Sequence, residues 1–89
     1  MSKVYLFMKF DVADFAKWQA VYDNHLPARQ QFGLKDLYVL RNIENQNSVT
    51  LFFEGEDLEK VKLFLASEEL RKKEKESGVM GKSTFEFLK

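Results

Sequence analysis

The order in which strand-like and helix-like patterns follow one another constrains this 89-residue chain more than any other feature. Apolar side chains alternate in four short runs, which predict strands at Lys3–Phe10, Asp36–Asn42, Ser48–Glu54 and Ser83–Lys89. Two longer stretches between these runs repeat apolar residues every three or four positions, as amphipathic helices do. The resulting β-α-β-β-α-β order predicts one α+β, ferredoxin-like domain over residues 1–89, with a four-stranded antiparallel sheet and both helices on one face.

The first helix is predicted from Phe15 to Phe32. Asp11 and Asp14 precede it and offer an N-cap and a first-turn acid, and a glycine follows it. Pro27 lies inside the pattern, where it removes a backbone donor and disfavours helical geometry at the preceding residue. We therefore expect a kink, or a break and restart, at Pro27.

The second helix is predicted from its cap at Asp57 to Gly78. Ser67, followed by two glutamates, has the pattern of a second cap with an acidic first turn, which predicts a bend there. The charged stretch Glu68–Glu76 is interpreted as a solvated helical face. Between the two middle strands, Ile43–Asn47 has the amide-rich composition of a hairpin loop.

Composition excludes several classes of function. Hydrophobic residues make up 45% of the chain and aromatic residues 15%, which is too rich for disorder. Fourteen basic residues balance fourteen acidic ones, so neither nucleic acid nor an anionic membrane is an expected partner. There is no cysteine, which excludes disulfides, cysteine-based metal sites and a thiolate nucleophile. The apolar run at the N-terminus is far shorter than the roughly 20 residues of a membrane span, and we expect a cytoplasmic location.

The second face of the predicted sheet carries more apolar surface than a monomer usually exposes. The helices can cover one face only, yet aromatic and aliphatic residues also occupy the other parity of the strands: Tyr5, Phe7, Tyr38, Leu40, Phe52 and Leu88. Two-fold pairing is the commonest form of association among soluble chains. We therefore predict a homodimer in which two sheets pack face to face.

The candidate site comes from the first helix. At about 100° per residue, His25 and Arg29 fall within the same apolar stripe as Trp18 and Tyr22. A buried guanidinium needs a partner such as a carboxylate, a carbonyl, water or an anion. We predict a pocket between this helix and the sheet, with Trp18 and Tyr22 as ligand-binding walls and His25 and Arg29 as catalytic candidates. In the alternative reading, His25 binds a carbonyl freed by Pro27 and Arg29 reaches a surface acid.

Three other motifs carry little weight. Gly81–Thr84 looks like the end of a phosphate-binding loop. However, Glu76 occupies the position of the required first glycine, and the segment leads into a strand, so no helix N-terminus points at a phosphate. A metal site would rest on His25 with Glu54, Glu56 or Asp57, which lack ligand spacing, so we expect no metal and no cofactor.

The third motif is the element order itself, which RNA-recognition motifs share, with aromatic residues on the open face of the sheet. Tyr5, Phe7 and Phe52 fit such a reading. However, Ser48–Glu54 lacks the basic residue and the glycines of the strand-three signature, and the net charge is zero. Binding of single-stranded RNA is retained as a minor alternative.

The run Asp14–His25, followed by Arg29 and Gly33, resembles small members of the dimeric α/β-barrel superfamily, which includes antibiotic biosynthesis monooxygenase-like proteins. Phe52–Glu54, Asp57–Lys60 and Ser67–Arg71 fit the same pattern, so the resemblance covers nearly the whole chain. It implies a barrel-like homodimer with a cavity in each protomer between sheet and helices.

Relatives in this superfamily include cofactor-independent oxygenases and haem-degrading enzymes. The Asn, Trp and His used by the haem-degrading relatives cannot be placed here, since the first strand has no Asn and Trp18 lies on the first helix. The resemblance therefore leaves the activity open between a cofactor-independent oxygenase or proton-transfer enzyme and a non-catalytic binding or interaction module. In an enzyme, His25 would be the acid or base and Arg29 would polarise an oxygen.

Overall fold

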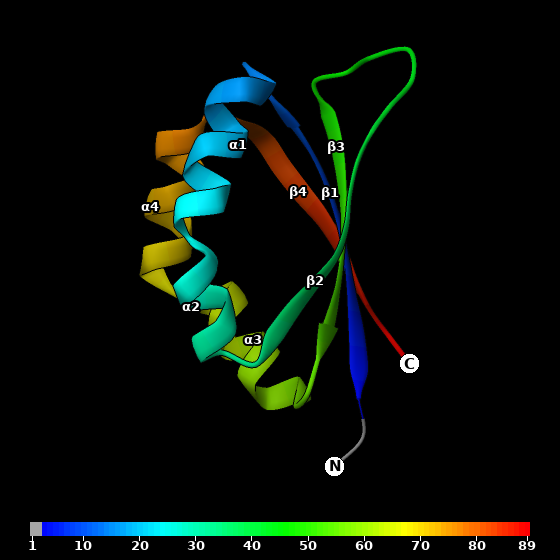
Figure 1. The fold of residues 1–89 in the computed structure, drawn as a ribbon, viewed down its shortest axis with the longest axis vertical. Coiled ribbons are helices and arrows are strands. Elements are labelled where there is room, and N and C mark those ends of the chain that lie inside the picture. The colour runs from blue at the N-terminus through cyan, green and yellow to red at the C-terminus, as the bar shows by residue number, and fades with distance from the viewer. Residues whose placement is uncertain (1–2) are drawn as a thin grey trace.

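The computed structural model describes residues 3–89. Its elements are β1 (Val4–Val12), α1 (Phe15–Asn24), α2 (Leu26–Gln31), β2 (Leu34–Arg41), β3 (Ser48–Gly55), α3 (Leu58–Ala66), α4 (Glu68–Ser77) and β4 (Val79–Leu88). The strands pair antiparallel in the order β2-β3-β1-β4, and the helices gather on one side of the sheet (Figure 1). The predicted ferredoxin-like fold is confirmed, with each predicted helix divided in two.

Both helix breaks lie where the sequence places them. The first falls at His25, and Pro27 lies in the first turn of α2, where its missing N–H loses no helical hydrogen bond. The second falls at Ser67, whose extended backbone separates α3 from α4. Its hydroxyl accepts from the backbone N–H of Leu70 at 3.2 Å and donates to the carbonyl of Phe64 at 2.8 Å.

Several boundaries differ from the predictions. The cap of α1 is Asp14, which accepts from the N–H of Ala16 at 3.0 Å, whereas Asp11 belongs to β1. β2 begins at Leu34, directly after a glycine, instead of at residue 36. β4 begins at Val79 instead of residue 83, because left-handed Gly78 (φ 83°) turns the chain straight from α4 into the sheet.

The core lies between the sheet and the helices. Leu6, Val49 and Val61 have no exposed surface, and each such buried side chain contributes roughly 1.5–3 kcal/mol through removal of apolar surface from water. Trp18 from α1 joins this core, with its ring centroid 5.5 Å from that of Phe10. The aromatic stripe of α1 is therefore packed directly onto β1.

The opposite face of the sheet carries no helix (Figure 1). Phe7 and Phe52 lie opposite each other on this face, with ring centroids 5.3 Å apart, and Tyr38 meets Phe52 edge-on. Tyr38 is 61% exposed and Leu40 is also exposed. The predicted aromatic second face is confirmed. Within residues 3–89, no helix is long and apolar enough to cross a membrane.

Candidate functional site

A cavity of about 50 Å³ lies between the helices and the sheet. The four residues predicted for the site, Trp18, Tyr22, His25 and Arg29, all line it. The remaining lining comes from β1, β3, α3, α4 and β4: Met8, Phe10, Leu51, Phe53, Phe64, Leu70, Glu74 and Val79. The break between α1 and α2 therefore brings two polar side chains and two aromatic walls to one enclosed, mainly apolar space.

Arg29 is anchored by three sets of contacts. Its Nε and Nη2 each lie 3.0 Å from an oxygen of Asp36, at the start of β2. Its Nη1 donates to the carbonyl of Tyr22 at 2.7 Å, and the guanidinium carbon lies 3.7 Å from the centre of the Tyr22 ring. A guanidinium has five N–H donors, so two remain outside these bonds. Arg29, which is 3% exposed, joins α1, α2 and β2 and keeps donor capacity beside the cavity.

His25 lines the same cavity and has an unpaired ring nitrogen. Its side chain is 7% exposed, and Nε2 is buried without a hydrogen bond. The carboxylate of Glu69 lies 3.5 Å from Nε2 but outside hydrogen-bonding geometry. Burial lowers the pKa of His25, and the positive charges of Arg29 and Lys73 lower it further, against the opposing effect of Glu69. At neutral pH the imidazole is therefore uncharged and able to accept a proton.

Tyr22 supplies a second unpaired polar atom. Its ring stacks on Trp18, with centroids 4.7 Å apart, and its hydroxyl is buried without a hydrogen bond of acceptable geometry. Burial raises the pKa of Tyr22 far above its ordinary value; Arg29 opposes this rise and Asp36 adds to it. The hydroxyl is thus a neutral donor at any physiological pH. An unpaired buried polar group costs about 1–3 kcal/mol, so two around one cavity favour a polar guest.

Glu74 is a candidate site residue that sequence reasoning missed. The solvated-face interpretation of Glu68–Glu76 is wrong for this position, because Glu74 is half-buried and lines the cavity. Burial raises the pKa of its carboxyl, while Arg71 and the hydroxyl of Ser83 act in the opposite direction. Helical spacing in the sequence could have indicated this position, since Leu70, Glu74 and buried Ser77 share one face of α4.

A larger groove of about 480 Å³ adjoins the cavity along α4 and β4. Four residues line both spaces: Met8, Leu70, Glu74 and Val79. The groove continues outward from them along Leu65, Lys75, Gly81, Lys82, Ser83 and Phe85. A small space and a much larger one thus share a boundary of four side chains.

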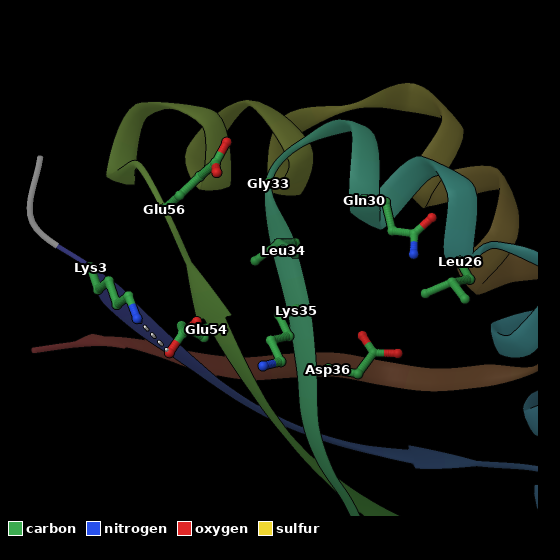
Figure 2. A pocket seen from close by; sticks show the side chains of 9 residues that line it. All are labelled: Lys3, Leu26, Gln30, Gly33, Leu34, Lys35, Asp36, Glu54 and Glu56. Carbon is green, nitrogen blue, oxygen red and sulfur yellow. Dashed lines mark ion pairs between the residues drawn. The ribbon is translucent and has the colours of Figure 1, made fainter.

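A separate hollow of about 440 Å³ lies beside α2 and the adjacent ends of β1, β2 and β3, and Figure 2 shows its charged lining. Its carboxylates already have partners: Lys3 lies 3.6 Å from Glu54, Lys60 lies 3.1 Å from Glu56, and Asp36 binds Arg29. His25 does not line this hollow. Across residues 3–89, no three His, Cys, Asp or Glu side chains are grouped so that they could hold a metal ion.

The antiparallel four-stranded sheet and the single helical layer define a ferredoxin-like α+β domain with a cavity between sheet and helices. No family model matches the sequence, and no curated protein matches it significantly.

Solved structures match the whole chain. A provisionally named antibiotic biosynthesis monooxygenase from Bordetella bronchiseptica superposes with a TM-score of 0.82 at 15% identity, covering 100% of this chain and 97% of that one. SnoaB, a cofactor-independent oxygenase from Streptomyces nogalater, gives 0.78 at 15% identity, covering 100% and 93%. A conserved protein from Methanosarcina mazei gives 0.75 at 13% identity, covering 100% and 93%. The chain has the fold of the antibiotic biosynthesis monooxygenase-like proteins, as its sequence resemblance predicts.

Proposed function

We propose that this protein binds a small, partly apolar organic molecule in the cavity beneath α1 and carries out cofactor-independent acid–base or oxygenase chemistry on it. The observation that carries the proposal is that His25 and Tyr22, whose Nε2 and Oη atoms are buried and unpaired, both line one mainly apolar cavity. The similarity in fold to a protein named as a cofactor-independent oxygenase supports the same class of reaction.

Each candidate residue has a role that its surroundings permit. His25 is the proton acceptor, because its lowered pKa keeps the imidazole neutral at neutral pH, with one ring nitrogen able to take up a proton. The N–H donors of Arg29 not used by Asp36 and Tyr22 are available to polarise a ligand oxygen. Trp18 and Tyr22 form an aromatic wall against which a planar or aliphatic body packs.

Trp18 provides the direct test, since it is the single tryptophan of the chain and lines the cavity. Titration with small apolar alcohols and ketones is expected to change its fluorescence saturably, and Tyr22→Phe and His25→Gln are expected to weaken the affinity. Tyr38→Phe, which removes an exposed hydroxyl from the open sheet face, is the matched control. A fluorescence that no such compound changes saturably would overturn the proposal.

A measurement of turnover distinguishes an enzyme from a non-catalytic binding module, the two classes that the sequence leaves open. An enzyme is expected to consume oxygen, or to exchange a substrate C–H for deuterium, with a rate that His25→Gln abolishes. A binding module would retain ligand affinity and show neither reaction. In either case we propose a cytoplasmic homodimer whose sheets cover each other, and this arrangement leaves no open face for single-stranded RNA.

A further inference from the structure

We propose that Glu74 selects the ligand at the boundary between cavity and groove, favouring a neutral or cationic hydrogen-bond donor there and disfavouring an anion. This inference rests on the proposed function, since it assumes that the cavity beneath α1 is the ligand site. It assigns a specificity role to a residue outside the His25 and Arg29 pair.

The boundary between the two spaces is built from four side chains. Met8, Leu70 and Val79 are apolar, and Glu74 is the one that carries a hydrogen-bonding group. Together with His25, Glu74 also lines a further small hollow of about 40 Å³ between α1 and α4. A molecule that extends from the groove toward His25 therefore crosses the boundary to which Glu74 belongs.

The two volumes define which part of a ligand meets that carboxyl. A space of about 50 Å³ accommodates one short substituent, whereas about 480 Å³ accommodates a ring system or a branched chain. The body of the ligand thus lies in the groove, against Leu65, Leu70 and Phe85. Its short polar end lies in the cavity, which the side chains of His25 and Tyr22 line. The atoms that join the body to this end lie beside Glu74.

The surroundings of Glu74 determine how strongly it discriminates between ligand charges. The carboxyl is half-buried, so its interactions with a ligand charge are less screened than they would be on the surface. Burial raises the pKa of Glu74, and Arg71 and the hydroxyl of Ser83 oppose this rise. In its ionised form the carboxylate accepts hydrogen bonds and repels an anion. Lys75 and Lys82 line the outer groove beyond the boundary, so an acid is tolerated at the outer end of a ligand but not at its centre.

A matched series of optically transparent probes tests the selection. Cyclohexylmethanol, cyclohexylmethylamine and cyclohexanecarboxylate share one ring and differ in the short group. Affinities are measured through the fluorescence of Trp18 for the wild-type protein, Glu74→Gln and Glu76→Gln. Glu76 is exposed on the same helix and lies 3.4 Å from Lys73, so its variant controls for loss of a negative charge.

The wild-type protein is expected to bind the alcohol and the amine at least about tenfold more tightly than the carboxylate. Glu74→Gln, which keeps the size of the side chain, is expected to reduce that gap to about threefold or less. It should do so by gaining affinity for the carboxylate. Glu76→Gln is expected to keep the wild-type gap.

Contrary results separate the two proposals. An unchanged gap in Glu74→Gln, with saturable binding of the probes, would show that the cavity binds ligands and that Glu74 does not select them. A gap that closes equally in Glu76→Gln would assign the effect to general surface charge and overturn the role of Glu74. Absence of binding by every probe to the wild-type protein would overturn both the proposed function and this inference.

Discussion

The Arg29 guanidinium and the Asp36 carboxylate form a two-point ion pair, with both nitrogen-to-oxygen distances at 3.0 Å. Arg29 lines the internal cavity, whereas Asp36 lines the charged hollow on the other side of β2 and α2, as Figure 2 shows for Asp36. The pair is therefore the wall between these two spaces. It also fixes the short helix α2, with its six residues, to the edge strand of the sheet.

Replacing Asp36 with Ala is expected to destabilise the protein by about 3 kcal/mol, since the 3%-exposed Arg29 charge then lacks its carboxylate. This figure is the low end for a buried ion pair, because Asp36 is 30% exposed and water can partly replace it. Urea unfolding measures the loss, with exposed Glu44→Ala in the hairpin loop as the control. A loss below about 1 kcal/mol would show that the pair does not anchor α2.

The double variant Arg29→Met with Asp36→Leu tests the same ion pair by removing both of its charges. Removing both charges leaves no uncompensated guanidinium, and Met occupies much of the volume of Arg. The double variant is therefore expected to be more stable than Asp36→Ala in the same urea experiment. If it is less stable, the hydrogen bond from Arg29 to the carbonyl of Tyr22 contributes more than the ion pair.

His25 makes the stability of the protein depend on pH. Because its pKa in the folded chain lies below the ordinary value of 6.5, the unfolded chain takes up the proton first as the pH falls. The stability linked to the neutral imidazole is complete above about pH 6.5 and is lost between that value and the lowered pKa.

The measurement compares urea unfolding of the wild-type protein and His25→Gln across this pH range. The difference between the two cancels other titrating groups, Glu74 among them. The wild-type protein is expected to lose stability relative to His25→Gln on acidification, and the NMR titration of the imidazole should give a pKa below 6.5. Parallel pH curves for the two proteins would contradict the buried, neutral state of His25.

The fold could be predicted because it follows from local patterns in the sequence. Alternation in the strands, glycine after each helical pair and the serine cap at residue 67 each act over a few neighbouring residues, so each can be recognised in the sequence. The burial of His25 and Arg29 follows from helical periodicity for the same reason. The early start of β4 was missed, because the left-handed Gly78 makes a turn of one residue where the pattern allowed a longer loop.

Tertiary partners were not predictable in the same way. The need of Arg29 for a carboxylate is evident from its position, but the choice of Asp36 depends on the bulge that lies between Asp36 and Tyr38 in β2. Glu74 joins the cavity because α4 packs against α1, which no short-range pattern reports. Sequence periodicity thus located the helix whose residues line the cavity, and packing supplied the remaining lining residues.

Ser67 controls the helix that carries Leu70 and Glu74. Ser67→Ala removes the acceptor for the N–H of Leu70 and is expected to cost about 1 kcal/mol in urea unfolding. Since the first turn of α4 then frays, probe affinity at the Glu74 boundary should fall as well. Ser67→Asp restores an N-cap acceptor and is expected to recover both properties. A loss of stability that Asp does not recover would assign the effect to the bond from Ser67 to Phe64.

The open sheet face is expected to hold two copies of the chain together, and Tyr38 offers the cleanest test. Tyr38 is 61% exposed within one chain, so Tyr38→Glu costs a monomer little, whereas it places a charge inside a sheet-to-sheet interface. Light scattering is expected to give twice 10.5 kDa for the wild-type protein and 10.5 kDa for Tyr38→Glu. Ile43→Glu is the matched control, because Ile43 is 94% exposed in the hairpin loop between β2 and β3. A wild-type protein that stays monomeric at high concentration would rule out the homodimer. Phe7 and Phe52 would then form a free aromatic platform, and a titration with single-stranded RNA would become the decisive measurement.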